Sequence, residues 1–234
     1  MFNPNYYLNL IRNQPIVYNG LTMYIVPLKQ ICEYGVERYD NLILPFSLTP
    51  KCFNRPIESI LRQGILANLD LFNSFVEMLS LVTHYDVCRP TEEYIDLKLD
   101  DGSEFRIDDS NFEDICDIIL KMNAKGRIEI TEKPQNASAR VNDVWEKLEK
   151  GRKRYAEKNK VNLWDMLNIC EFAGDYHISI GEMDEWSLWK ITNCYKARIG
   201  WKSYDDAFEV AMVSGETKDI SDENHWFKRF MVRE

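Results

Sequence analysis

The sequence predicts an α+β protein that is mainly helical, and three observations lead to this class. Two hairpin signals lie before residue 110, amphipathic helices alternate with them, and helix signals alone follow residue 160. We therefore expect an N-terminal α+β domain with two β-hairpins at 1–123, a linker and a basic connecting helix at 124–160, and an all-α C-terminal domain at 161–234.

The first hairpin is marked by Asn19-Gly20, because both central residues of a type I′ turn take a positive φ. Its strands are expected at Ile16–Tyr18 and Leu21–Val26. Pro27 then suits the first position of a helix, which we expect to be short and to end at Gly35.

Three helical stretches are expected between this hairpin and the next. One runs from Val36 to about Leu44 and stops at Pro45, which lacks a backbone donor. Pro56–Arg62 indicates a helical turn. The stretch Leu66–His84 predicts an amphipathic helix, because its apolar residues recur at steps of three and four. These residues are Leu69, Phe72, Phe75, Val76 and Leu79.

The second hairpin is centred on Asp101-Gly102, where apolar residues alternate with polar ones on both sides. The alternating residues are Ile95, Leu97, Leu99, Phe105 and Ile107. A helix follows, and Ser110 with Glu113 predicts a capping box at its start. Its apolar face is expected to contain Phe112, Ile115, Cys116, Ile119 and Leu120.

Residues 124–137 lack helical phasing and predict a linker or an irregular arm. The next stretch, 138–160, contains eight Lys or Arg against four Asp or Glu. Its one apolar cluster is Val141, Val144, Trp145 and Leu148. A solvated helix that bridges two regions is the simplest interpretation. The alternative is a contact with an acidic partner or with phosphates, made by Lys150, Arg152, Lys153 and Arg154.

The C-terminal part shows helix signals separated by glycines. We expect a first helix that stops near Gly174, marked by Leu163, Met166, Leu167 and Cys170, and then a turn capped by Ser179 and Glu182. A second helix is expected to end at Gly200, and its apolar residues are Leu188, Ile191, Tyr195 and Ile199. A third helix is expected from a Ser203 cap to Gly215, with Tyr204, Phe208, Ala211 and Met212, and a short last helix is expected at Ser221–Phe230.

Composition excludes several classes of protein. Hydrophobic residues make up 45% and charged residues 29% of the chain, which is typical of globular proteins. The net charge of −9 disfavours nonspecific binding to nucleic acid or to anionic lipid. No apolar run reaches the roughly 20 residues that span a bilayer, and no signal peptide is recognised. Six scattered Cys predict neither a disulfide framework nor a zinc site, so we expect a reduced, cytoplasmic protein.

No catalytic, cofactor-binding or metal-binding residues are predicted. His84, His177 and His225 share no helical spacing and follow no catalytic motif. Acidic pairs such as Asp100-Asp101 and Asp108-Asp109 fit turns and a helix start. The chain has no glycine-rich phosphate loop, no GxSxG motif and no HExxH motif. We therefore expect a binding protein and not an enzyme.

Aromatic residues of the C-terminal part are candidates for partner binding. Trp186, Trp189, Tyr195 and Trp201 could form a hydrophobic docking face, since aromatic side chains are enriched at interfaces. The alternative is that they fill the core of a small helical domain, and this alternative is favoured on general grounds.

Several stretches resemble the tail assembly chaperones of phages and prophages of Gram-positive bacteria. They are VPLKQICEYGVERYDNLILPF (26–46), DDSNFEDICDIILKMN (108–123), ASARVNDVWEKLEKGRKR (137–154), MDEWSLWKITNCYKARIGWKSYDDAFEVAMVSG (183–215) and HWFKRF (225–230). The resemblance is spread over most of the chain, and it includes no catalytic signature.

The resemblance implies a protein of the host-cell cytoplasm that is absent from the finished virion. It would coat the helical tape-measure protein and deliver it to tail-tube subunits, and self-association is left open. In some family members a programmed frameshift appends the C-terminal region to a shorter product. The break at 124–137 would suit the boundary between the two parts. Other classes of function remain alternatives: a structural tail or baseplate component, or a small nucleic-acid-binding or host-takeover protein that uses the basic helix.

Overall fold

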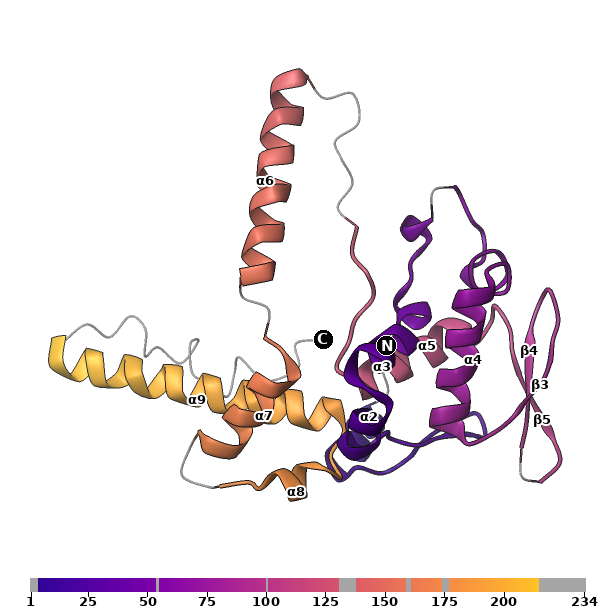
Figure 1. Cartoon of the computed structure of the whole chain (residues 1–234), viewed down its shortest axis with the longest axis horizontal. Coiled ribbons are helices and arrows are strands. Elements are labelled where there is room, and N and C mark those ends of the chain that lie inside the picture. The colour runs from indigo at the N-terminus through magenta and orange to yellow at the C-terminus, as the bar shows by residue number, and fades with distance from the viewer. Residues whose placement is uncertain are drawn as a thin grey trace.

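The computed structural model describes residues 4–53, 55–99, 101–130, 138–158, 161–173 and 177–214. An α+β N-terminal region is followed by a projecting helix and an all-helical C-terminal region (Figure 1). The predicted fold class, mainly helical α+β, is confirmed. The predicted helix at Ser221–Phe230 and His225 lie outside the described residues.

Helices and strands alternate in the N-terminal region. The helices are α1 (Pro4–Arg12), α2 (Leu28–Tyr34), α3 (Val36–Ser47), the 3₁₀ turn η1 (Pro50–Cys52), the π-helical turn η2 (Ile60–Ile65), α4 (Leu69–Thr83) and α5 (Phe112–Met122). The strands are β1 (Ile16–Tyr18), β2 (Leu21–Met23), β3 (Val87–Pro90), β4 (Ile95–Lys98) and β5 (Glu104–Ile107). The remaining helices are α6 (Ala139–Lys158), α7 (Leu163–Phe172), α8 (Ile180–Met183) and α9 (Leu188–Ser214).

The first hairpin has the predicted register and turn. Tyr18 pairs with Leu21, and Asn19 and Gly20 take φ values of 50° and 90°. The second strand ends at Met23, three residues before the predicted end at Val26. Helix α1, which is not among the predicted elements, packs beside this hairpin with Leu10 fully buried.

The helix after Gly35 continues through Pro45, so the predicted stop was wrong. Pro45 lies in the last turn of α3, where the missing backbone donor removes only one helical hydrogen bond. Phe46 is fully buried, and its ring stacks on that of Phe75 in α4 at 4.6 Å between centroids. Burial of this aromatic side chain offsets the lost hydrogen bond.

The next two helical elements begin later than predicted. The turn expected at Pro56–Arg62 is the π-helical turn η2, which begins at Ile60, with the Ser59 hydroxyl accepting from the Arg62 N–H. Helix α4 begins at Leu69 and not at Leu66, because Asn68 caps it and accepts from the Asp70 and Leu71 N–H groups.

The second sheet has three antiparallel strands in the order β3-β4-β5, of which two were predicted. Ile95 pairs with Ile107 and Leu97 with Phe105, as the alternation requires. The turn at Asp101-Gly102 is confirmed, with Gly102 at a φ of 81°. The additional strand, β3, pairs irregularly with β4 through a register shift.

Helix α5 buries the predicted apolar face, but the predicted capping box is absent. The Ser110 hydroxyl donates to the Asp108 carboxylate at 2.5 Å, and Asn111 occupies the N-cap position without a side-chain cap bond. The Glu113 carboxylate accepts instead from the Arg127 guanidinium. Both members of the expected box therefore bind other residues.

The segment after α5 is an irregular arm that packs back on the N-terminal region. Arg127 donates to the Phe46 carbonyl at 3.0 Å and to the Asp117 carboxylate at 2.9 Å. The Ile128 N–H donates to the Ser47 carbonyl at 2.7 Å. Between 124 and 130 the chain is thus fixed to the ends of α3 and α5, while 131–137 lie outside the described residues.

The C-terminal region contains one long helix where two were predicted. Helix α9 runs from Leu188 to Ser214 without a break at Gly200 or at Ser203. Lys202 pairs with Asp206 one turn later at 2.6 Å, which bridges the expected gap. The predicted cap at Ser179 and Glu182 is present at α8, and α7 ends at Phe172.

Backbone hydrogen bonds attach the C-terminal region to the N-terminal one. The Leu28 N–H donates to the Trp186 carbonyl at 2.9 Å, and the Lys29 N–H donates to the Asp184 carbonyl at 3.0 Å. These two donors belong to the first turn of α2, where backbone N–H groups have no partners within their own helix. Leu28 is buried in the small core between α7 and α9. Because the two regions share this packing, the structure does not separate them into independent domains, and the predicted domain boundaries stay a prediction.

Candidate functional site

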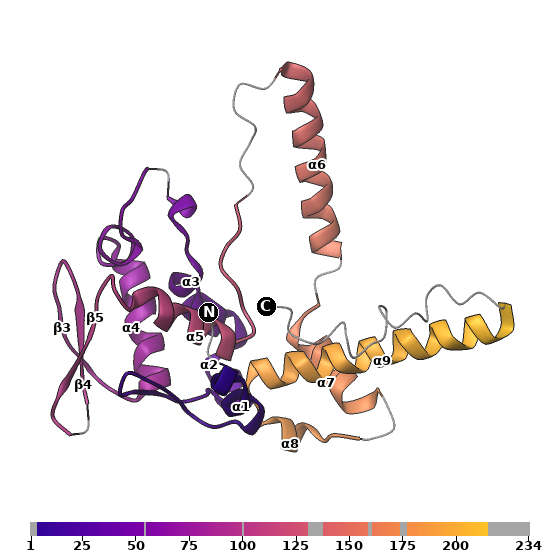
Figure 2. The same cartoon turned by 180° about the vertical axis from the view of Figure 1, so that it is seen from behind.

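Helix α6 stands away from the rest of the chain in both views (Figures 1 and 2). Among the described residues it has no extended packing against another helix or strand. It is 20 residues long, and a helix of such a charged sequence gains little from its own propensity alone. A helix in this position is available for contact with another molecule.

The apolar cluster of α6 forms one exposed stripe. Val141, Val144 and Leu148 are 47%, 52% and 57% exposed, and Trp145 between them is half-buried. Positions i, i+3, i+4 and i+7 lie on one side of a helix, which is the spacing of a coiled-coil contact. Burying these side chains against a partner would be favourable, at about 25 cal/mol per Å² of apolar surface.

The predicted basic residues all lie exposed on the second half of α6. Lys150, Arg152, Lys153 and Arg154 follow the apolar stripe, and Arg152 pairs with Glu149 at 3.1 Å. An exposed pair of this kind contributes little stability. The basic half of α6 therefore remains able to attract acidic groups from solution.

The four aromatic candidates of the C-terminal region do not gather on one surface. Trp189 packs against the N-terminal core, with its ring 6.4 Å from that of Tyr7. Trp186 and Tyr195 pack against the core between α7 and α9, and Lys190 lies over the Trp186 ring at 4.3 Å. Trp201 is 51% exposed, further along α9. Three of the four thus contribute to packing.

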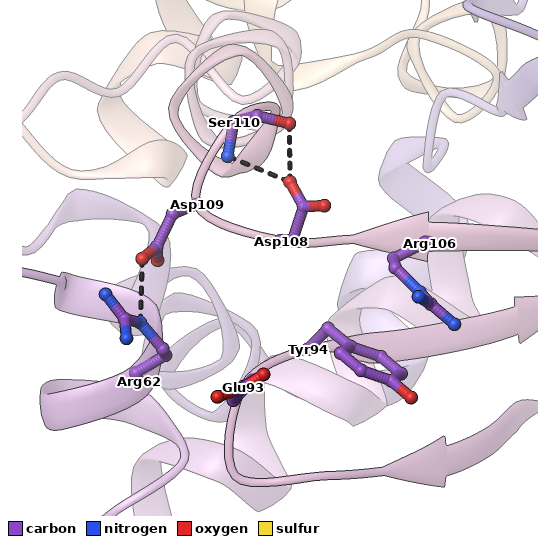
Figure 3. A pocket seen from close by; sticks show the side chains of 7 residues that line it. All are labelled: Arg62, Glu93, Tyr94, Arg106, Asp108, Asp109 and Ser110. Atoms are coloured by element: carbon purple, nitrogen blue, oxygen red, sulfur yellow. Dashed lines mark hydrogen bonds and ion pairs between the residues drawn. The ribbon is translucent and has the colours of Figure 1, made fainter.

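A shallow pocket of the N-terminal region was not anticipated from the sequence. It lies between η2, the start of β4 and the turn before α5, and it has a volume of about 480 Å³ (Figure 3). Its side chains are Arg62, Glu93, Tyr94, Arg106, Asp108, Asp109 and Ser110. Only their convergence in space reveals it, because they come from three separate segments of the chain.

The charges of this pocket are mostly paired. Arg62 binds the Asp109 carboxylate at 2.8 Å, and Arg106 binds that of Asp96 at 3.0 Å (Figure 3 shows the first pair). Arg106 also stacks over Tyr94 at 3.7 Å. Its hydrogen bond to Asp96 raises the pKa of the Arg106 guanidinium.

Asp108 has its hydrogen bonds within the turn. The Ser110 hydroxyl and N–H both donate to its carboxylate, and these bonds lower the pKa of Asp108. An acid that stays ionised suits neither proton donation nor proton uptake near neutral pH. The arrangement stabilises the turn between β5 and α5.

The described histidines occupy structural positions. His84 ends α4 in a left-handed conformation with a φ of 60°, and its ring stacks on Tyr24 at 4.5 Å. The Nδ1 atom of His177 lies 3.1 Å from the Glu171 carbonyl. Within the described ranges, no three His, Cys, Asp or Glu side chains are grouped so that they could hold a metal ion.

Comparisons of the chain with protein-family models, with curated proteins and with solved structures found no match. None of the described helices is long and apolar enough to cross a membrane. Among the described residues, α6 combines exposed apolar side chains at helical spacing with a lack of extended packing against another helix or strand.

Proposed function

We propose that the protein is a non-catalytic tail assembly chaperone that binds the tape-measure protein of a phage tail through α6. The supporting observation is the exposed stripe of Val141, Val144, Trp145 and Leu148 on a helix that projects from the body. The resemblance of 137–154 to the tail assembly chaperones includes this same helix.

The spacing of the stripe favours a helical partner. Residues at i, i+3, i+4 and i+7 fit into the groove between the side chains of a second amphipathic helix. A tape-measure protein is long and helical, and its apolar face needs cover before it is enclosed in the tail. The stripe could cover part of that face.

The charge of α6 supports the same partner. The chain has a net charge of −9, whereas α6 contains seven Lys or Arg against four Asp or Glu. An acidic stretch of the partner is therefore repelled by the body and attracted to α6. This polarity orients the partner along the helix before the apolar contacts form.

Co-expression tests the proposal. The chain is produced together with the long helical protein encoded in the same gene cluster, and the two are purified through a tag on the chain. We expect a complex, together with a soluble yield of the partner that is lower without the chain. If no complex forms and the partner is equally soluble alone, the proposal is wrong.

Two variants locate the contact. Changing both Val144 and Leu148 to Asp places charges in the stripe and should weaken the complex at least tenfold, roughly 1.4 kcal/mol or more. Leu69→Asp is the matched control, because Leu69 is 72% exposed in the first turn of α4, where an acid is tolerated. An equal loss in both variants would contradict a contact through α6.

The exposed basic side chains also favour a second candidate, a nucleic-acid-binding protein. In that case Lys150, Arg152, Lys153 and Arg154 would neutralise phosphates, and binding to DNA would fall steeply with salt. A gel-shift titration separates the two candidates. Salt-sensitive retardation that disappears when the four residues are changed to Gln would favour nucleic acid over a protein partner.

A structural tail or baseplate component is distinguished by its location. A chaperone acts during assembly, so mass spectrometry of purified virions should not detect the chain. Detection in amounts similar to the tail-tube protein would replace the chaperone proposal with a structural one.

A further inference from the structure

Helices α7 and α9 pack side by side and bring two cysteines together. Cys170 of α7 is fully buried, with its Sγ 3.7 Å from the Ile191 carbonyl of α9. Cys194 of α9 is half-buried at the edge of the same core. The Cys170 sulfur therefore lies against the turn of α9 that precedes Cys194, and both cysteines belong to one core cluster.

Two cationic side chains flank Cys194 on its own helix. Lys190 and Arg198 lie four residues before and after it, so both share its side of α9. Arg198 and Lys190 both bring positive charge to the Cys194 sulfur. A thiol surrounded in this way is expected to lose its proton readily.

The two thiols are expected to differ in proton affinity. The neighbouring Cys170 thiol, with the Arg198 and Lys190 charges, lowers the pKa of Cys194 to about 6. The Cys194 side chain and burial raise the pKa of Cys170. Of the two thiols, Cys194 is therefore the one expected to lose its proton first.

Other described cysteines have different surroundings. Cys32 is more exposed than Cys194, but partial burial and the charge of Asp184 raise its pKa. Cys116 is fully buried, and burial raises its pKa strongly. Exposure alone would make Cys32 the most reactive of these thiols, whereas the electrostatics favour Cys194.

We propose that Cys194 is a site of oxidative modification, which forms a disulfide with Cys170 when the protein meets a low-molecular-weight disulfide. The Cys194 thiolate attacks one sulfur of that molecule, and the other half leaves as a thiolate. Cys170 then attacks the Cys194 sulfur, its proton passes to solvent, and the second thiolate leaves. The two protein thiols are oxidised and the small disulfide is reduced to two thiols.

The disulfide would link α7 to the first half of α9. The loop that it closes contains α8 and the Asp184 and Trp186 carbonyls that bind the first turn of α2. Oxidation would therefore restrict the segment that joins the C-terminal region to the N-terminal one. A cross-link of this kind stabilises a fold mainly by restricting its unfolded chain.

Peptide mapping tests the proposal on the full-length chain. The reduced protein is treated with oxidised glutathione at about pH 7, where the thiolate of an ordinary cysteine is scarce. Free thiols are then blocked with iodoacetamide. We expect a Cys170–Cys194 cross-link to form before any modification of Cys32. Earlier modification of Cys32, or a stable glutathione adduct on Cys194 without the cross-link, would overturn it.

The pH dependence of alkylation provides a second test that does not depend on the cross-link. We expect the rate of iodoacetamide reaction at Cys194 to have its midpoint near pH 6 in the intact protein. Cys170→Ala removes the neighbouring thiol and should raise this midpoint by at least about one unit. The reaction of Cys32 is the internal control and should not change. A wild-type midpoint at or above that of Cys32 would overturn the proposal.

Discussion

At the scale of single residues, the packing of the N-terminal region depends on a few polar side chains with several partners. Arg127, with 22% of its side chain exposed, joins the end of α3 to α5 through the Phe46 carbonyl and the Glu113 and Asp117 carboxylates. The sequence around Arg127 has no helical or strand period, so only the folded chain reveals this role. The partners of such side chains are what sequence patterns predict least.

Replacing Arg127 by Ala should reduce the free energy of unfolding by about 2–3 kcal/mol, because it removes several charge-assisted hydrogen bonds that are partly shielded from water. Urea denaturation measures the change. Arg152→Ala removes a single exposed pair with Glu149 and should cost less than about 0.5 kcal/mol. Similar losses in both variants would contradict the role of Arg127.

The raised pKa values of two tyrosines predict that the folded protein loses stability at alkaline pH. The Tyr18 hydroxyl donates to the Asp114 carboxylate at 2.8 Å, and partial burial with this bond raises the pKa of Tyr18 from 10.0 to about 12. Burial also raises the pKa of Tyr39, whose hydroxyl donates to Asn123 at 2.6 Å.

Because the folded pKa lies above the unfolded one, this stabilisation is complete below pH 10 and is lost as the pH rises towards 12. Tyr18→Phe should therefore flatten the decrease of unfolding free energy over that interval. Denaturation at a series of pH values gives both slopes, and identical slopes for wild type and Tyr18→Phe would contradict the prediction.

At the scale of elements, periodicity located most helices and strands, while several of their ends depended on packing or capping that periodicity does not contain. The Asn19-Gly20 and Asp101-Gly102 turns were predicted from local chemistry alone. The continuation through Pro45 places Phe46 in the core, and α9 is unbroken where the Lys202–Asp206 pair joins one turn to the next. A glycine or a serine signals a helix end only when the following chain leaves the helical conformation.

The continuity of α9 predicts the effect of changing Ser203. In the interior of a helix Ser203→Ala should be neutral or should stabilise by up to about 0.5 kcal/mol, because Ala has the higher helix propensity. At a helix N-cap the same change would cost about 1 kcal/mol. Thermal denaturation decides between them, with Ser179→Ala at the observed cap of α8 as the destabilising reference.

Helix α6 is expected to be stabilised by removal of its central glycine. A Cβ atom at Gly151 would meet nothing within 4 Å, so Gly151→Ala should favour the helix by about 1 kcal/mol. Amide hydrogen exchange should then slow about fivefold along α6. Gly126→Ala, in the irregular arm where a Cβ also has space, should not change exchange in α6. Unchanged exchange in α6 of the Gly151 variant would mean that its helix is held by other contacts.

At the scale of the whole molecule, the fold class was predictable and the candidate site only in part. The basic residues and the apolar cluster of α6 were recognised from the sequence, and a solvated helix was the simplest interpretation, but its projection from the body was not predicted. The docking face formed by Trp186, Trp189, Tyr195 and Trp201 does not gather in the structure, since three of the four pack inward against two different cores. Periodicity identifies an apolar face, and only the tertiary arrangement shows what covers it.

The most direct test of a chaperone that binds through α6 is amide hydrogen exchange of the chain alone and in its complex with the tape-measure protein. We predict that exchange slows most at 141–148, where the apolar stripe lies, and less along the basic half of α6. Exchange in α4 should stay the same. A complex in which α6 exchanges as fast as in the free chain would contradict the proposed contact.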